Sequence, residues 1–257
     1  MTPAAAQKKN TNAGSERYRK IIRSWARLAL GTVLVAGTAA CSRIQHVETA
    51  PVGAIADSIP GAEGKSAVPV RVTDIFTLVS AMKRGGYVVV FRHAPTNRDQ
   101  ADTDPLDYAD TIHQRLLSDK GREVAKQVGD AFRRLGIPIG EIYTSRYNRA
   151  VETAKLIGGT DVMTTLDVTE GGLVATPIEN DRRAAALKLL VESEPDSGKN
   201  TIIVTHKPNL VDAFGADWVS SKDAEASVFK PDGSGQPVLV ARVQAADWIK
   251  AAEGNIK

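Results

Sequence analysis

The sequence predicts an α/β fold: a three-layer α/β/α sandwich whose sheet is mainly parallel with an antiparallel edge strand. The main observation is that short β-branched runs alternate with amphipathic helical stretches. The runs at 87–92 and 201–205 are apolar and bounded by turn formers, a pattern typical of strands buried on both faces of a parallel sheet. A composition of 42% hydrophobic and 25% charged residues over 257 positions fits one such domain.

Each element has its own local signal. The helix expected at 73–84 carries an apolar face and ends at a Gly-Gly pair, and the helix that opens at Ser118 ends at Gly136. Residues 94–117 form a long polar stretch rich in Asp, and loops of this length are usually functional or mobile. The remaining expected elements are a strand at 141–144, a helix from the Arg149 region to Gly158, a helix at 181–194, a hairpin of 226–230 with 238–243 at the sheet edge, and a helix at 245–252.

The N-terminal region has a different character. Its first 27 residues hold seven Lys and Arg against one Glu, a charge of +6, so the rest of a chain with net charge +3 carries −3. The positive charge therefore belongs to the leader, and we expect no nucleic acid as a partner. Thirteen apolar or small residues follow at 28–40, which is too short for a membrane span and typical of a signal peptide.

The only cysteine, Cys41, stands where cleavage would fall. The stretch Thr38-Ala39-Ala40-Cys41-Ser42 resembles a bacterial lipobox, although Thr38 replaces the usual Leu. We therefore expect a lipoprotein-type signal peptide at 1–40, lipidation of Cys41, a flexible tether at 41–69 and a folded domain at 70–257. This predicts a membrane lipoprotein of the cell envelope that faces the bacterial periplasm. A soluble secreted or periplasmic protein and an uncleaved anchor remain alternatives.

Two histidines close two of the predicted strands. His93 ends the first apolar run and His206 ends the run at 201–205, and ligands of open α/β sheets bind beyond the carboxyl ends of such strands. Arg92 and Arg149 belong to the same edge. A cluster of His and Arg without a carboxylate does not suit a metal ion, because guanidinium groups repel cations. It suits a phosphoryl group held by N–H donors, and we expect neither a metal nor another cofactor.

Four motifs in order carry a family resemblance. Arg92-His93-Ala94 resembles the Arg-His-Gly signature of the histidine phosphatase superfamily, branch 1, and within it the small bacterial phosphohistidine-phosphatase-like group. The other motifs are Leu117-Ser118-x-x-Gly121-x-x-x-Ala125, Tyr143-Thr144-Ser145-x-x-x-Arg149-Ala150-x-x-Thr153-Ala154 and Val204-Thr205-His206. Two positions depart from the family pattern, because Ala94 replaces Gly and Arg146 replaces Pro.

The resemblance implies a phosphomonoesterase or phosphoramidase that works through a phosphohistidine. His93 would be the nucleophile, kept as a free base by neighbouring cations, and Glu170 would give a proton to the leaving group. The remaining candidates are Arg92, Arg149 and His206 around the phosphoryl oxygens, and Thr96, Arg115 and Ser145 as further substrate contacts. The partner would be a phosphorylated small molecule or a phosphoprotein.

Two other functions stay open at this stage. One is a non-catalytic module that binds a phosphorylated ligand or a partner, which the departures at Ala94 and Arg146 allow. The other is a phosphotransferase like the phosphoglycerate mutases of the same superfamily, although an exported protein would not meet their glycolytic substrates.

Overall fold

The computed structural model describes residues 74–172, 174–234 and 236–254. The predicted signal peptide, Cys41, the whole tether at 41–69 and the first four residues of the predicted domain lie outside the described residues, so lipidation and envelope localisation stay predictions. Within the described ranges, none of the helices has the length and apolar character needed to cross a bilayer.

A six-stranded mixed sheet forms the middle layer, in the order β3-β2-β4-β1-β5-β6. The first four strands of that order run parallel, whereas β5 pairs antiparallel with β1, and β6 pairs antiparallel with β5. The predicted fold class, with its hairpin at the sheet edge, is therefore confirmed. The strands are β1 (Val88–Arg92), β2 (Ile139–Thr144), β3 (Met163–Thr164), β4 (Asn200–Thr205), β5 (Ala226–Lys230) and β6 (Val238–Val243).

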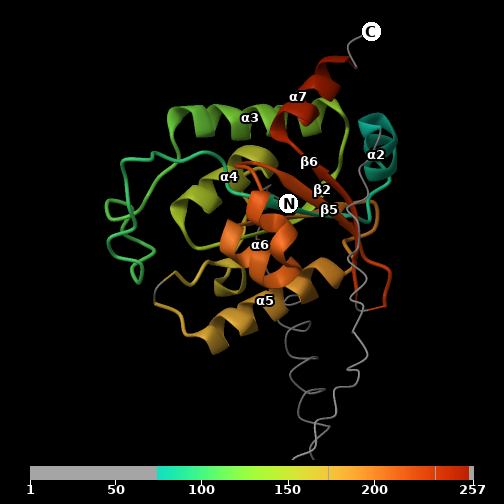
Figure 1. The fold of residues 1–257 in the computed structure, drawn as a ribbon. Helices are drawn as coiled ribbons and strands as arrows, with labels where there is room; N and C mark the ends of the chain where they lie inside the picture. Colours follow the sequence, from blue (N-terminus) through green and yellow to red (C-terminus); the bar gives the residue numbers. More distant parts are fainter. Residues whose placement is uncertain (1–73, 173, 235, 255–257) are drawn as a thin grey trace, which may run out of the picture.

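Helices cover both faces of the sheet (Figure 1). On one face α3 packs against α4 and α7, and α7 also contacts α2; on the other face α5 packs against α6. The helices are α2 (Ile75–Met82), α3 (Asp119–Arg134), α4 (Asn148–Gly158), α5 (Pro177–Glu192), α6 (Lys207–Phe214) and α7 (Ala245–Gly254), with short 3-10 turns η1 (Leu166–Val168) and η2 (Ala216–Ser220).

Strand β1 shows why the central runs are apolar on both sides. Val89 and Phe91 pack into the core beneath α3 and α7, while Val88 and Val90 pack into the core beneath α5 and α6. All four side chains are completely buried. A strand covered on both faces needs a continuous apolar run rather than alternation, as the sequence showed.

Three elements differ from the expectations. The two-residue strand β3 and the helix α6 were not predicted, because one is very short and the other spans eight residues with a proline in its first turn. Helix α5 starts at Pro177 rather than near 181: Thr176 caps it by accepting a hydrogen bond from the Glu179 N–H at 3.2 Å. Its first turn exposes Ile178, so this turn lacks the apolar face that marks the rest of the helix.

The start of α3 fixes the chain segment that follows His93. Ser118 caps the helix by accepting from the Gly121 N–H at 3.0 Å, and its own N–H donates to the Pro95 carbonyl at 3.1 Å. A Cβ atom added to Gly121 would lie only 1.9 Å from that carbonyl oxygen. The glycine therefore allows the helix to approach the backbone just beyond the histidine.

Gly121→Ala should push α3 away from Pro95 and lower the free energy of unfolding by about 1–3 kcal/mol, the usual cost of overpacking. Urea denaturation of the variant and of the wild type measures this difference. Lys120→Ala, at the exposed neighbouring position, is the control and should change stability little. A Gly121→Ala protein as stable as the wild type would show that this close approach is not required.

Candidate active site

The two histidines lie side by side at the ends of neighbouring parallel strands. Arg92 and Thr205 are register partners at the ends of β1 and β4. The next backbone contact continues the ladder, because the His93 N–H donates to the Thr205 carbonyl at 3.0 Å. The two imidazole rings are 5.2 Å apart between centroids. The parallel register thus brings to one point two residues that are far apart in the chain.

His93 has a defined tautomer. Its Nδ1 atom lies 2.8 Å from the Ala94 carbonyl oxygen, which can only accept, so Nδ1 carries the proton and Nε2 keeps its lone pair. Burial lowers the pKa of His93 well below its ordinary value, and the charges of His206, Arg149 and Arg92 lower it further. His93 is therefore a neutral base at neutral pH, with Nε2 available to attack.

Both departures from the family pattern fit the backbone. Among the described residues other than glycine, only Ala224 has a positive φ, so Ala94 needs no glycine-like conformation. Its methyl group is completely buried, and its N–H donates to Thr153 Oγ1 at 3.1 Å. The exposed residue Arg146 donates its N–H to Thr169 Oγ1 at 2.9 Å, a bond that proline could not make.

Arg149 is completely buried near the start of α4, and its guanidinium lies over the Tyr147 ring at 4.2 Å. Two carboxylates from different loops balance its charge. Nη1 is 2.9 Å from Asp102 Oδ1, and Nη2 donates to Glu170 Oε1. A buried guanidinium without such partners would be strongly destabilising. A phosphoryl group that binds Arg149 must therefore replace or join these carboxylates.

Arg92 is anchored from the segment after η2. Its Nη1 donates to the Ser221 carbonyl at 2.7 Å, and its Nη2 lies 2.7 Å from Asp223 Oδ1. The side chain is 19% exposed. This segment follows α6, and the position of Arg92 depends on an element that was not predicted.

Glu170 is held in place by the segment before it. The Thr169 carbonyl accepts from Arg183 Nη1 at 3.0 Å and from Asn209 Nδ2 at 3.2 Å, and its hydroxyl donates to the Thr165 carbonyl at 2.7 Å. These bonds come from α5, α6 and the loop itself. Glu170 consequently has a rigid backbone beside Arg149, and its Oε1 lies 3.4 Å from His206 Nδ1.

The three residues predicted as further substrate contacts differ in solvent exposure. Thr96 and Arg115 are partly exposed; Thr96 forms an isolated bridge with Leu117, and the Arg115 N–H donates to Asp102 Oδ1 at 2.9 Å. Ser145, predicted to touch the substrate, is completely buried, and its hydroxyl lies 2.7 Å from His206 Nε2 instead. Neither Ser145 nor His206 is exposed to solvent.

Two carboxylates that were not among the predicted site residues, Asp102 and Asp223, also belong to the cluster. Asp102 lies in the long polar loop, whose many aspartates gave no means of choosing one, and Asp223 follows η2 in a stretch without any motif. Across the described part of the chain, no three His, Cys, Asp or Glu side chains gather in a way that could hold a metal ion. The cluster offers cations and imidazoles to an anion.

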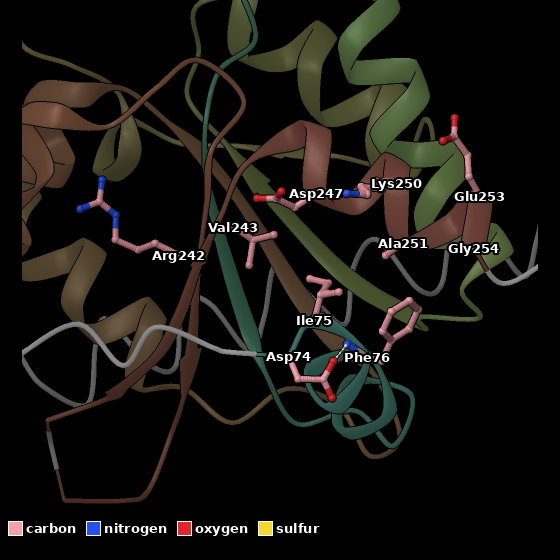
Figure 2. Close-up of a pocket in the computed structure, with 10 residues that line it drawn as sticks. All are labelled: Asp74, Ile75, Phe76, Arg242, Val243, Asp247, Lys250, Ala251, Glu253 and Gly254. Carbon is pink, nitrogen blue, oxygen red and sulfur yellow. Dashed lines mark hydrogen bonds between the residues drawn. The ribbon is translucent and has the colours of Figure 1, made fainter.

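A separate hollow of about 740 Å³ lies between α2 and α7 (Figure 2). Asp74, Phe76 and Lys250 are among the residues that line it, and none of the candidate site residues does. Its lining mixes apolar and oppositely charged side chains, so it has no marked preference for an anion.

One family model matches part of the chain. Residues 88–171, about a third of the chain, match the model of the histidine phosphatase superfamily (branch 1). This match includes His93, Arg149 and Glu170, whereas His206 lies beyond it. No curated protein matches the chain.

Several solved structures are similar at low identity. They include the protein histidine phosphatase SixA with tungstate, at 17% identity and a TM-score of 0.45, with 62% of this chain and 97% of that chain covered. A phosphoserine phosphatase mutant from Entamoeba histolytica in complex with phosphoserine is 15% identical, with a TM-score of 0.44 and the same coverage. At these identities the likenesses say nothing about the substrate of this chain.

The buried histidines predict how stability depends on pH. The pKa values of His93 and His206 are both held well below 6.5 in the folded state, so the unfolded chain binds more protons as pH falls below 6.5. The free energy of unfolding should therefore decrease below pH 6.5, by up to about 1.4 kcal/mol per pH unit for each histidine.

Urea denaturation at pH values from about 7.5 to about 5 measures this dependence, because the ordinary histidine pKa of about 6.5 lies within that range. His93→Gln should make it shallower. His113→Gln is the control: Asp110 raises the pKa of this exposed histidine, whose contribution has the opposite sign, so its loss should not flatten the slope. A stability that stays constant over this range would contradict the neutral, buried state of His93 and His206.

Proposed function

We propose that this protein hydrolyses phosphate monoesters or phosphoramidates through a phosphohistidine on His93. The observation that carries the proposal is the His93 ring itself, whose Nδ1 is fixed by the Ala94 carbonyl, so that a neutral Nε2 remains available among Arg92, Arg149 and His206. The match of residues 88–171 to the histidine phosphatase superfamily supports the same reaction class.

The charges of the cluster suit the first step. A phosphoryl dianion repels nucleophiles, so a catalyst must neutralise its charge and hold the attacking atom in line. Arg92 and Arg149 supply two cations, and a neutral His93 brings no negative charge of its own. Nε2 attacks phosphorus, the N–P bond forms, and the bond from phosphorus to the leaving oxygen or nitrogen breaks.

The second step returns the enzyme to its starting state. Water attacks the phosphohistidine, the N–P bond breaks, and inorganic phosphate leaves while Nε2 recovers its lone pair. We propose that Glu170 is protonated once the phosphoryl dianion is bound, that it gives this proton to the leaving atom in the first step, and that it takes a proton from water in the second. The rigid segment before Glu170 and its place beside Arg149 and His206 support this role.

The ligand-free arrangement implies an exchange of anions. Arg149 is engaged by Asp102 and Glu170. If Glu170 stays to deliver its proton, Asp102 is the carboxylate that the phosphoryl oxygens replace. Asp102 belongs to the long polar loop at 94–117. We therefore propose that this loop places Asp102 on Arg149 when no substrate is present.

Two alternatives are separated by a simple measurement. A module that only binds phosphorylated ligands would not release phosphate from p-nitrophenyl phosphate, and a mutase-like enzyme would transfer phosphate to a second substrate rather than to water. The substrate class beyond a phosphorylated small molecule or phosphoprotein is tested by screening phosphorylated metabolites, sugars and phosphohistidine peptides.

His93→Ala should abolish turnover and leave the protein folded, because the covalent step needs Nε2 and losing a nucleophile leaves only binding and electrostatic effects. Rapid quench of the wild type during turnover should trap an acid-labile, base-stable phosphate on the protein. If no such adduct forms, or if His93→Ala keeps more than about a hundredth of the activity, the mechanism is wrong.

Arg149→Ala should lose far more activity than Arg146→Ala, since only the first guanidinium is buried beside His93. We expect a loss of about 10²-fold or more in kcat/KM for Arg149→Ala, comparable to removing a charge-stabilising donor. Arg146 is exposed, and its structural bond is made by the backbone, which alanine keeps. Similar losses in the two variants would show that Arg149 is not the phosphate-binding residue.

A further inference from the structure

We propose that Ser145 is a positioning residue that fixes the tautomer of His206, so that the neutral imidazole presents Nδ1–H to the phosphoryl group. The inference rests on the proposed function and adds to it a role for a completely buried side chain that contacts His206. Ser145 Oγ lies 2.7 Å from His206 Nε2, and His206 Nδ1 lies 3.4 Å from Glu170 Oε1. The imidazole thus has a hydroxyl on one side and a carboxylate on the other.

The hydroxyl has one proton to give. The Tyr147 N–H donates to Ser145 Oγ at 3.2 Å, so one lone pair of that oxygen is already used. Within the described ranges, the only acceptor in contact with the hydroxyl is His206 Nε2. A buried hydroxyl satisfies its proton where an acceptor is in reach, so Ser145 donates and Nε2 accepts.

The environment of the other nitrogen leads to the same tautomer. His206 Nδ1 is buried and makes no hydrogen bond in the ligand-free protein. It faces the Glu170 carboxylate, and a nitrogen lone pair directed at an anion would be repelled, whereas an N–H group is attracted. A phosphoryl oxygen in this site would be attracted for the same reason. The proton of the neutral ring therefore lies on Nδ1.

The neutral state has its own cause. Burial lowers the pKa of His206 well below its ordinary value, and the charges of Arg149, Arg115 and Arg92 lower it further. A neutral imidazole has only one N–H, so its tautomer decides whether it donates to the ligand or repels it. Ser145 selects the tautomer because its oxygen accepts a hydrogen bond from the Tyr147 N–H and its hydroxyl donates a hydrogen bond to His206 Nε2.

The order hydroxyl, imidazole, carboxylate is also that of a Ser-His-acid triad, in which the serine attacks the substrate. We assign Ser145 no such attack, because its buried hydroxyl is engaged by the Tyr147 N–H and by His206 Nε2, and His93 already supplies the nucleophile of the proposed reaction. In this proposal the three groups orient the His206 ring. Ser145 therefore acts through His206, and His93 remains the one nucleophile of the proposed reaction.

The tautomer is measured directly by two-bond ¹H–¹⁵N correlation NMR on the ligand-free full chain with ¹⁵N-labelled histidine, where His206→Gln identifies the signals. We expect a protonated Nδ1 and an unprotonated Nε2 in the wild type. In Ser145→Ala, Nε2 loses its donor, and part of the population should move its proton to Nε2. A wild-type His206 that is protonated at Nε2, or on both nitrogens near neutral pH, would overturn the proposal.

Steady-state kinetics tests the consequence. Ser145→Ala should reduce kcat by about 10–100-fold, the usual effect of removing a supporting partner of an active-site histidine. Thr144→Val is the matched control, because the neighbouring hydroxyl is equally buried but has no hydrogen-bond partner. This variant should keep the wild-type tautomer and kcat.

The outcomes separate this inference from the proposed function. A wild type with the expected tautomer but without phosphatase activity would contradict the proposed function and leave the placement of the proton intact. An active wild type whose His206 signals and kcat are unchanged by Ser145→Ala would contradict the inference alone. If Ser145→Ala does not fold, the wild-type spectrum still decides, since it requires no variant at position 145.

Discussion

A guanidinium group that has no contact with water must have its charge balanced by anions held close to it. Arg149 is in this position, completely buried near the start of α4, with Asp102 and Glu170 on its two terminal nitrogens. Each carboxylate comes from a different loop at the carboxyl edge of the sheet. The buried charge thus ties both loops to the helix and gives the site its shape before any ligand arrives.

Burial lowers the pKa of both His93 and His206, and the positive charge of Arg149 beside them lowers it further, so both rings stay neutral. Their backbone and hydroxyl partners then assign different roles to two rings of the same type. The Ala94 carbonyl leaves His93 with a free Nε2, whereas Ser145 leaves His206 with a free N–H. One ring is suited to attack phosphorus and the other to bind its oxygens.

The positions of His93, His206 and Arg149 could be predicted from the sequence, because each depends on a local sequence pattern. The apolar runs before His93 and His206 predict strands buried on both faces, and the parallel register of β1 with β4 then brings the two residues together. Arg149 lies where its motif predicted, at the start of a helix after β2.

The partners of these residues could not be predicted in the same way, because they depend on how distant loops pack. Asp102 is one of several aspartates in its loop, and only the folded chain selects it as the partner of Arg149. Asp223 contacts Arg92 because α6 and η2 lead the chain back to β1, and α6 itself lacks a clear sequence signal. The burial of Ser145 and its contact with His206 likewise follow from the tertiary structure, because no local sequence signal gives the depth of a side chain.

The most direct test of the central claim is a crystal structure of the protein with orthovanadate, which adopts the geometry of a phosphoryl group under attack. We expect vanadium bonded to His93 Nε2, with vanadate oxygens on Arg92, Arg149 and His206 Nδ1, and with Asp102 displaced from Arg149. Vanadate bound away from His93, or a structure in which Asp102 still contacts Arg149 while vanadate fills the site, would contradict this expectation.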